Sequence, residues 1–229
     1  MRSIFWTAVL VLGFAFPIQA QLEDKVADRL YESSKILDEL VQAPDGGIPR
    51  DLLRRAQCVA VVPAVKNLAI GVGGKYGRGA VSCRRGDSNR SWGPPSMISL
   101  SGGSFGIQLG GSSTDVVMLF MTNDSMQHLL KDKVTLGADL GAAAGPIGRS
   151  ATADTDATMH AEILTYARSR GLFAGVSLNG AALQPDKDAN KNLYNRAVEA
   201  KELLIEGKGV IPEPARKFVD TLTRVSAGK

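Results

Sequence analysis

Short β-rich segments separated by glycine clusters fill the middle of this chain, from Cys58 to about Leu140, and they constrain its fold most strongly. Closely spaced short strands with turn residues between them predict an antiparallel sheet or a partly closed barrel. Glycine weakens a strand unless the backbone bends or approaches a neighbour closely, so the sheet is expected to curve. The β-rich segments are Cys58 to Val62, Leu68 to Val72, Ala80 to Cys83, Met97 to Leu100, Phe105 to Leu109, and Val116 to Met121.

Helical patterns flank this central region. Apolar residues spaced by fours and sevens predict an amphipathic helix from Leu22 to Val41, whose polar face is net acidic and whose apolar face is expected to pack on the domain's own core. The predicted class is α+β, with a curved, glycine-rich, mainly antiparallel sheet or partly closed barrel packed with N-terminal and C-terminal helices. Further elements are expected as a short helix from Pro49 to Arg55, a helix from Ala157 to Arg170, a strand from Leu172 to Leu178, a helix from Asp188 or Asn190 to near Gly207, and a helix from Glu213 to Val225.

The first twenty residues are typical of a secretory signal. Arg2 precedes an apolar run from Ile4 to Phe16, and Ala20 ends a small-residue cleavage pattern. The alternative is a membrane anchor, but a bilayer crossing needs roughly 17 to 25 apolar residues and this run is shorter. We therefore expect a signal peptide over residues 1–20 and a single domain over residues 21–229. The mature chain is expected to be exported, periplasmic or secreted, and soluble or peripherally attached to a membrane.

Export changes the meaning of the two cysteines. Cys58 and Cys83 both fall in predicted strands, and an oxidising compartment allows them to form a disulfide. Two buried free thiols are the alternative. No metal site is expected, because these cysteines and the distant His128 and His160 lack the spacing of metal ligands.

Basic residues are concentrated in residues 50–90. Nine Arg and Lys residues stand there against Asp51 and Asp87, a net charge of +7, whereas the whole chain carries only +4. That total is too small to indicate nucleic-acid binding, but a local basic region suits anionic headgroups or a phosphate-bearing ligand. The alternative is ordinary solvated surface charge.

Glycine-rich motifs in the sheet region resemble catalytic or nucleotide-binding loops only in part. The segment from Gly71 to Gly79 fits neither a dinucleotide fingerprint nor a Walker A loop, because Tyr76 occupies the deciding position. The segment around Ser104 matches a nucleophile elbow, and Asp115 or Asp139 followed by His160 gives the order of triad partners. A strand pattern follows where the elbow needs a helix, so a serine hydrolase is a distant alternative. Asp154 and Asp156 are better explained as helix caps than as calcium ligands.

Several blocks, in order along nearly the whole mature chain, resemble the SYLF family, which is shared by phosphoinositide-binding and actin-patch proteins of eukaryotes and by exported bacterial proteins. The blocks are residues 56–63 (AQCVAVVP), 73–79 (GGKYGRG), 91–96 (SWGPPS), 102–110 (GGSFGIQLG), 115–117 (DVV), 136–139 (LGAD), 145–149 (GPIGR), 166–180 (YARSRGLFAGVSLNG) and 192–194 (NLY).

This resemblance implies a non-catalytic, lipid-binding domain without a cofactor, in which the N-terminal helix and basic residues contact membrane. The net acidic helix from Leu22 to Val41 departs from that pattern, and actin and phosphoinositides are not expected partners outside the cytosol. We therefore expect an envelope module that recognises anionic phospholipid headgroups. The alternative is a protein-interaction or scaffold domain that uses the sheet edge and the Trp92 region to contact an envelope protein. The expected lipid-contacting residues are Arg54, Arg55, Lys75, Arg78, Arg84 and Arg85.

Overall fold

A curled sheet forms the centre of the computed structural model, which describes residues 18–42, 47–70, 72–86, 91–105, 110–147, 161–169 and 172–227. Nine strands are present in these ranges, in the order β5-β9-β3-β2-β1-β4-β7-β6, with β8 added on β7. All pairings are antiparallel except that of β6 with β7. The strands are β1 (Cys58–Ile70), β2 (Val72–Cys83), β3 (Ser96–Phe105), β4 (Gly110–Phe120), β5 (Val134–Thr135), β6 (Ala142–Ala144), β7 (Ile163–Ser169), β8 (Leu172–Gly175) and β9 (Ala181–Pro185).

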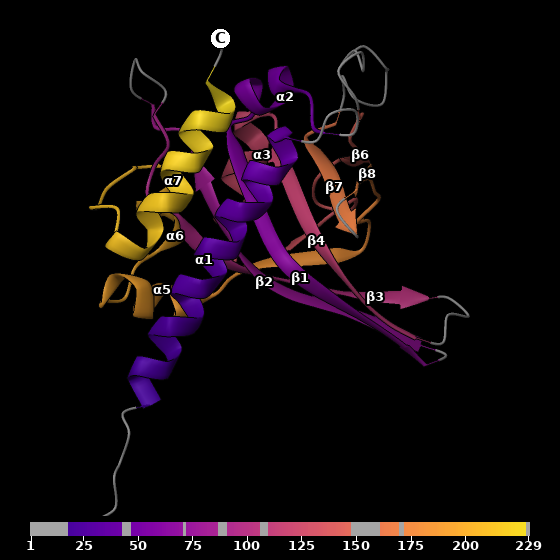
Figure 1. The fold of residues 1–229 in the computed structure, drawn as a ribbon, viewed down its shortest axis with the longest axis horizontal. Helices are drawn as coiled ribbons and strands as arrows, with labels where there is room; N and C mark the ends of the chain where they lie inside the picture. The colour runs from indigo at the N-terminus through magenta and orange to yellow at the C-terminus, as the bar shows by residue number, and fades with distance from the viewer. Residues whose placement is uncertain are drawn as a thin grey trace, which may run out of the picture.

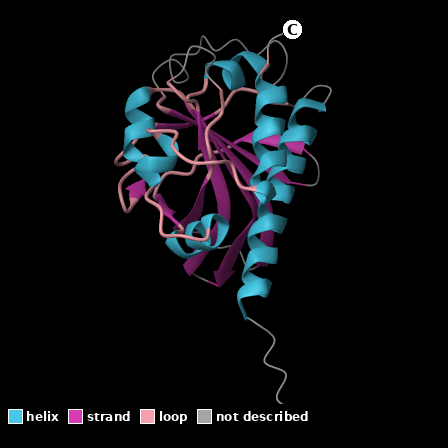
Figure 2. Ribbon diagram, turned by 90° about the vertical axis from the view of Figure 1, so that its left-hand side faces the viewer, coloured by secondary structure: helices cyan, strands magenta, loops and turns pink. Residues whose placement is uncertain are grey.

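The two longest helices, from the two ends of the chain, lie together against one face of this sheet with two shorter helices beside them, while loops and two further short helices lie on the other side (Figures 1 and 2). The described helices are α1 (Ile18–Gln42), α2 (Arg50–Arg55), α3 (Asn123–His128), α5 (Lys187–Tyr194), α6 (Ala200–Leu204) and α7 (Glu213–Ser226). The predicted α+β class with packed terminal helices is therefore confirmed. None of the described helices has the length and apolar composition needed to cross a bilayer.

Strand alternation divides the buried residues into two cores. On the helix-covered face, Val59 and Val61 of β1 pack with Leu30 and Leu37 of α1 and with Phe218 of α7. The intervening residues point to the opposite face of the sheet, where the core includes Cys58, Ala60, Met118 and Phe120. Because both faces are covered, the central strands are apolar at nearly every position, which explains their continuous hydrophobic runs.

Tight packing between β1 and β2 requires glycine. A Cβ on Gly79 would lie 2.0 Å from the carbonyl oxygen of Val61, and a Cβ on Gly77 would lie 2.7 Å from a methyl carbon of Val62. The β1–β2 register also shifts between Val61 and Lys66. Glycine in this part of the sheet thus permits close backbone approach at an irregular ladder, as the sequence predicts.

Two helix predictions in the second half of the chain are wrong. Residues 163–169 of the expected helix from Ala157 to Arg170 form β7, a strand between β4 and β6, while residues 157–160 lie outside the described ranges. The expected helix ending near Gly207 is two helices, because Asn195 adopts a left-handed conformation (φ 54°) and ends α5. The side chain of Asp186, two residues before the expected start, caps α5 by accepting from the Ala189 amide at 3.1 Å.

Candidate functional site

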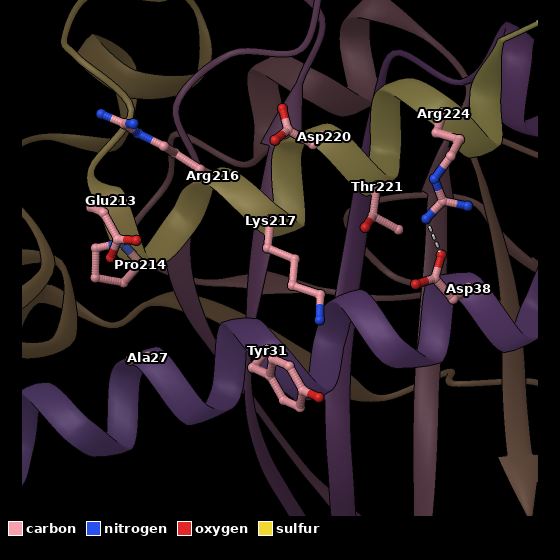
Figure 3. A pocket seen from close by; sticks show the side chains of 10 residues that line it. All are labelled: Ala27, Tyr31, Asp38, Glu213, Pro214, Arg216, Lys217, Asp220, Thr221 and Arg224. Carbon is pink, nitrogen blue, oxygen red and sulfur yellow. Dashed lines mark hydrogen bonds and ion pairs between the residues drawn. The ribbon is translucent and has the colours of Figure 1, made fainter.

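A groove of about 740 Å³ runs between α1 and α7 (Figure 3). The helices bury their apolar stripes against the sheet and each other, so their polar faces form the two walls. The contacts of Tyr31 with Lys217 and of Asp38 with Arg224 show that the two helices run in the same direction. The lining residues are Ala27, Tyr31, Asp38, Glu213, Pro214, Arg216, Lys217, Asp220, Thr221 and Arg224.

Tyr31 is the aromatic residue of this groove. Its side chain projects from the polar face of α1 and is 51% exposed, although most large apolar and aromatic side chains in the described structure are buried. The Lys217 ammonium lies 4.0 Å from the centre of the Tyr31 ring, which is cation–π geometry. At one end of the groove, Arg224 forms an ion pair with Asp38. The groove therefore combines an exposed aromatic ring with fixed charges of both signs.

A second, smaller depression of about 300 Å³ continues the groove at the beginning of α7. It shares Ala27, Glu213 and Pro214 with the first and adds Val26 and Leu193, together with Pro212. Its walls come from α1, α5 and the segment that leads into α7. The two depressions make one continuous surface feature along α1, more apolar at this end and more charged toward Asp38.

The acidic polar face of α1 holds the helix to the body of the protein. Glu39 pairs with Arg168 of β7, Asp38 pairs with Arg224 of α7, and Arg29 lies 3.7 Å from Asp186. Burial lowers the pKa of Arg29, and the nearby Asp186 carboxylate partly offsets this. The apolar side of α1 is committed to the core, where Leu30, Leu37 and Leu40 are fully buried. The prediction that this helix packs on its own core is confirmed.

Arg54, Arg55 and Arg84 lie together where α2 meets the end of β2. Arg54 and Arg55 are both well exposed and both pair with Asp51, at 2.5 and 3.8 Å. Arg84 is instead half-buried: it donates to the carbonyls of Ala56 (3.1 Å) and Arg54 (3.3 Å).

Arg85, the next residue, is also half-buried, and its Nε has no hydrogen-bond partner in the described part of the chain. Its side chain occupies the space that a Cβ on Gly207 would enter. Of these four arginines, Arg54 and Arg55 are therefore the ones that present their charge to solvent.

Lys75 and Arg78 lie far from this group along β2. Nine residues of extended strand separate Lys75 from Arg84, a span of about 30 Å. Arg78 donates to the hydroxyl of Tyr76 at 2.5 Å and lies 3.6 Å from Asp186, and the hydrogen bond to Tyr76 raises its pKa. The six predicted basic residues thus fall into two separate groups, so the structure does not bring them together as one site.

Cys58 and Cys83 face each other in the β1–β2 ladder and are joined by a disulfide. Both residues are buried. The bond links the start of β1 to the end of β2, next to the Arg84 and Arg85 backbone. Trp92 is buried as well, and its indole donates to the Ser226 hydroxyl at 2.9 Å, so the Trp92 side chain itself is not exposed to a partner.

The candidate hydrolase residues do not form a triad in the described structure. Ser104 lies within β3 and β4 follows, not the helix that a nucleophile elbow requires. Asp115 pairs with Arg168 at 3.2 Å and accepts from the Ala64 amide, while Asp139 accepts from the Thr135 amide, which lowers the pKa of Asp139. His160, Asp154 and Asp156 lie outside the described residues. No cluster of three potential metal ligands occurs among the described side chains.

Sequence reasoning missed the groove residues Tyr31, Lys217 and Arg224. The sequence did contain a relevant pattern. Tyr31 is an aromatic residue on the polar side of an amphipathic helix, and Lys217 and Arg224 are seven residues apart, which places them on the same face of α7. Neither pattern indicates that the two helices lie side by side, because that contact forms only in the tertiary structure.

Comparison with known proteins places the chain in a family. The family described as "Las17-binding protein actin regulator" (Ysc84) matches residues 101–225. "LAS seventeen-binding protein 3" of Saccharomyces cerevisiae is 32% identical over 222 residues, which are 93% of this chain and 46% of the yeast protein. The human "SH3 domain-containing YSC84-like protein 1" is 31% identical over 206 residues, which are 87% of this chain and 57% of the human protein.

This chain spans about half the length of these relatives. None of the three descriptions names a catalytic activity, and two of them name binding to another protein or regulation of actin. Because the family match extends over more than half of the residues, this chain belongs to the Ysc84, or SYLF, family.

Proposed function

We propose that this chain is a non-catalytic protein-binding module, and that the groove between α1 and α7 receives a segment of its partner. The observation that carries the proposal is the exposed Tyr31 ring in a groove with fixed charges of both signs. Tyrosine and arginine in partly enclosed positions are the residues that most often dominate protein interfaces. The names of the relatives, which refer to Las17 binding and actin regulation, support an interaction role for the family.

The groove also limits the form of the partner. From Ala27 to Asp38, α1 spans about 16 Å, enough for three helical turns or five extended residues. Three acidic and three basic residues line it, so it does not select a single sign of charge. The fitting segment carries one apolar or aromatic side chain for the Tyr31 and Pro214 end, with charges of both signs beside it.

Site-specific photocrosslinking tests this proposal. A photoreactive residue at Arg216, inside the groove, is compared with one at Lys201, an exposed position on α6 outside it. We expect one protein to crosslink from position 216 and not from 201, and the purified partner to lose at least tenfold in affinity with Tyr31→Ala. Tyr76→Ala is the matched control, because Tyr76 is 48% exposed and lies on β2. Identical adducts from both positions, or equal effects of both alanine variants, would exclude the groove.

The proposed location is the cell envelope or the exterior of the cell. The sequence of residues 1–20 and the Cys58–Cys83 disulfide support export, because structural disulfides persist mainly in oxidising compartments. Mass measurement of the protein recovered from its own cells tests this, with an expected N-terminus at Gln21. An intact N-terminus on a cytosolic protein with reduced cysteines contradicts it.

Peripheral binding to anionic membranes is a second candidate function. It is favoured by the exposed cations Arg54 and Arg55 on α2 and Arg78 on β2, with the half-buried Lys75 beside Arg78, whereas Arg84 bonds to backbone carbonyls and Arg85 is half-buried. Flotation with phosphatidylglycerol and with phosphatidylcholine vesicles, at low and moderate salt, tests it. We expect Arg54→Glu with Arg55→Glu, or Lys75→Glu with Arg78→Gln, to weaken flotation on the anionic vesicles. Arg216→Glu with Lys217→Glu is the control with a similar charge change in the groove, and equal losses in all variants would show only a net-charge effect.

A further inference from the structure

The outer face of α7 carries one stripe of charged residues. Glu213, Lys217, Asp220 and Arg224 follow one another at spacings of four, three and four residues, which places their side chains on the same side of the helix. All of them are exposed, and all line the groove (Figure 3). Along this charged stripe the sign alternates from negative at the start of α7 to positive at its end.

The acidic residues of the charged stripe have no partner within the described part of the chain. They form no ion pair there, because the two cations reach toward α1 instead. Lys217 lies over the Tyr31 ring, and Arg224 pairs with Asp38. The Arg224 side chain is still 60% exposed, so its guanidinium has donors left for a second carboxylate. The charged stripe is therefore able to form further ion pairs with another molecule.

The order of charges in this stripe is complementary to itself when reversed. Two copies of α7 laid antiparallel, with a two-fold axis between residues 218 and 219, bring Glu213 opposite the partner's Arg224 and Lys217 opposite the partner's Asp220. The symmetry repeats both pairings, so every charge of the stripe meets its opposite. A parallel pair of helices instead brings like charges together, and so does an antiparallel pair displaced by four residues in either direction. The charges thus select one register.

Tyr31 lies beside the centre of that register. It is at the level of Lys217, which is within two residues of the axis. Because α1 runs beside α7, stacking α7 face to face on the partner's α7 also brings the partner's α1 over α1. The levels of Lys217 and the partner's Lys217 differ by three residues, about 4.5 Å along the helix. The two Tyr31 rings therefore approach the axis together, and aromatic side chains at the centre of an interface contribute most to its stability.

We propose that the partner received by the groove is a second copy of this chain, with α1 and α7 of the two copies stacked antiparallel about this axis. The inference rests on the proposed function above, since it names the occupant of the same groove. The partner's Tyr31 is then the aromatic side chain that the groove receives, and the partner's charged stripe supplies both signs of charge. An unrelated segment needs the reversed order of charges, which this chain already carries. Since exposed ion pairs are screened by salt, self-association is expected to weaken at least about tenfold between 50 and 500 mM salt.

Charge-reversal variants of the full mature chain test the register by sedimentation velocity at low salt. Lys217→Glu and Asp220→Lys each place like charges opposite one another twice, so each is expected to weaken self-association at least about tenfold. A mixture of the two variants is expected to associate as tightly as wild type. In the mixed pair the new glutamate at position 217 meets the new lysine at position 220, while the unchanged residues at these positions meet each other.

Lys201→Glu is the matched control, because it makes the same charge change at an exposed position on α6, outside the groove. It is expected to associate like wild type. Unchanged melting temperatures show that the variants are folded, since all three substitutions are at exposed positions. A dimer that Lys217→Glu weakens no more than Lys201→Glu, or a mixture that stays monomeric, overturns the proposed register.

The photocrosslinking experiment at Arg216 separates this inference from the proposed function. An adduct of twice the chain mass from position 216 supports the second copy as the occupant. If the wild type is monomeric and position 216 captures a different protein, the groove remains a binding site and the second copy is excluded. If the wild type is monomeric and positions 216 and 201 give identical adducts, both proposals fail.

Discussion

The guanidinium of Arg84 stacks on the indole ring of Trp92, with 4.4 Å between the guanidinium carbon and the ring centre. The same two residues form an isolated β-bridge, and Arg84 also donates to the carbonyls of Ala56 and Arg54. Through Trp92, which bonds Ser226, the contact connects the end of β2 with α2 and the last turn of α7. A residue predicted to contact lipid therefore joins three elements of the fold.

Arg84→Ala is expected to lower the free energy of unfolding by about 2 kcal/mol, because it removes a cation–π contact and two hydrogen bonds to carbonyl oxygens. Arg84→Lys does not restore the loss, since lysine lacks the planar fork that stacks and donates together. Arg54→Ala is the control. Because the Arg54 side chain is exposed, its removal is expected to lower the free energy of unfolding by less than about 0.5 kcal/mol. Urea unfolding of the three variants measures the difference, and equal stability for Arg84→Ala and wild type would remove the structural role.

The Cys58–Cys83 disulfide closes a segment of 25 residues that includes the β1–β2 hairpin. Replacing both cysteines with alanine is expected to lower the free energy of unfolding by about 3 to 4 kcal/mol in the chain-entropy description. Guanidinium unfolding of wild type with and without reductant, beside the double variant, measures this. A reduced wild type as stable as the oxidised protein would mean that the bond adds nothing to the folded state.

Tyr166 is buried and Tyr194 is half-buried, and the two are expected to respond differently to substitution by phenylalanine. The Tyr194 hydroxyl donates to the Pro95 carbonyl at 2.6 Å, so Tyr194→Phe leaves that oxygen without this donor and destabilises by about 1 to 2 kcal/mol. The Tyr166 hydroxyl has no hydrogen-bond partner among the described residues, so Tyr166→Phe is expected to be neutral or stabilising by up to about 1 kcal/mol. Thermal unfolding at pH 7 compares the pair, and a large loss for Tyr166→Phe contradicts the burial of an unpartnered hydroxyl.

Alkaline pH is expected to destabilise the fold through these same tyrosines. Burial raises the pKa of both Tyr166 and Tyr194 above the ordinary value of about 10. The unfolded chain then loses these protons first, so their contribution is fully present below pH 10 and is lost as the pH rises further, by up to about 1.4 kcal/mol per pH unit for each group. Melting temperatures from pH 8 to 11.5 measure the slope. We expect Tyr166→Phe to flatten this dependence of the melting temperature on pH.

Gly79→Ala is expected to destabilise by more than about 3 kcal/mol. The added methyl group would meet the backbone oxygen of Val61 at 2.0 Å, which only separation of β1 from β2 can relieve. Gly103→Ala is the matched control in β3, where nothing lies within 4 Å of the added carbon. Chemical unfolding of both variants tests the close approach, and similar stabilities would show that the β1–β2 ladder tolerates the extra atom.

The sequence predicted the elements whose pattern is local. Residues 22–41 and 213–225 have an apolar stripe at helical spacing, and both form helices, because such a stripe is stabilised by any apolar surface it meets. The glycine-separated runs likewise predicted the curved sheet. Residues 163–169 were misassigned, because Ile163 to Tyr166 are buried on both faces of a central strand, and a short apolar run of that kind has no strand alternation.

The candidate sites depended more on tertiary structure. Sequence established that residues 50–90 are basic, and proximity along the chain suggested one surface. The extended β2 strand instead holds Lys75 about 30 Å from Arg84, and packing against Trp92 and beside Gly207 engages Arg84 and Arg85.

The sequence by itself thus determined the fold class and the kinds of residue available for binding. Only the tertiary structure decided which of them meet. The pairing of α1 with α7 forms the groove, and the packing of Arg84 on Trp92 removes one predicted cation from the solvent-exposed surface. The physical reason is that local patterns set backbone conformation, whereas the groove is built from segments far apart in the chain, brought together by burial of apolar surface.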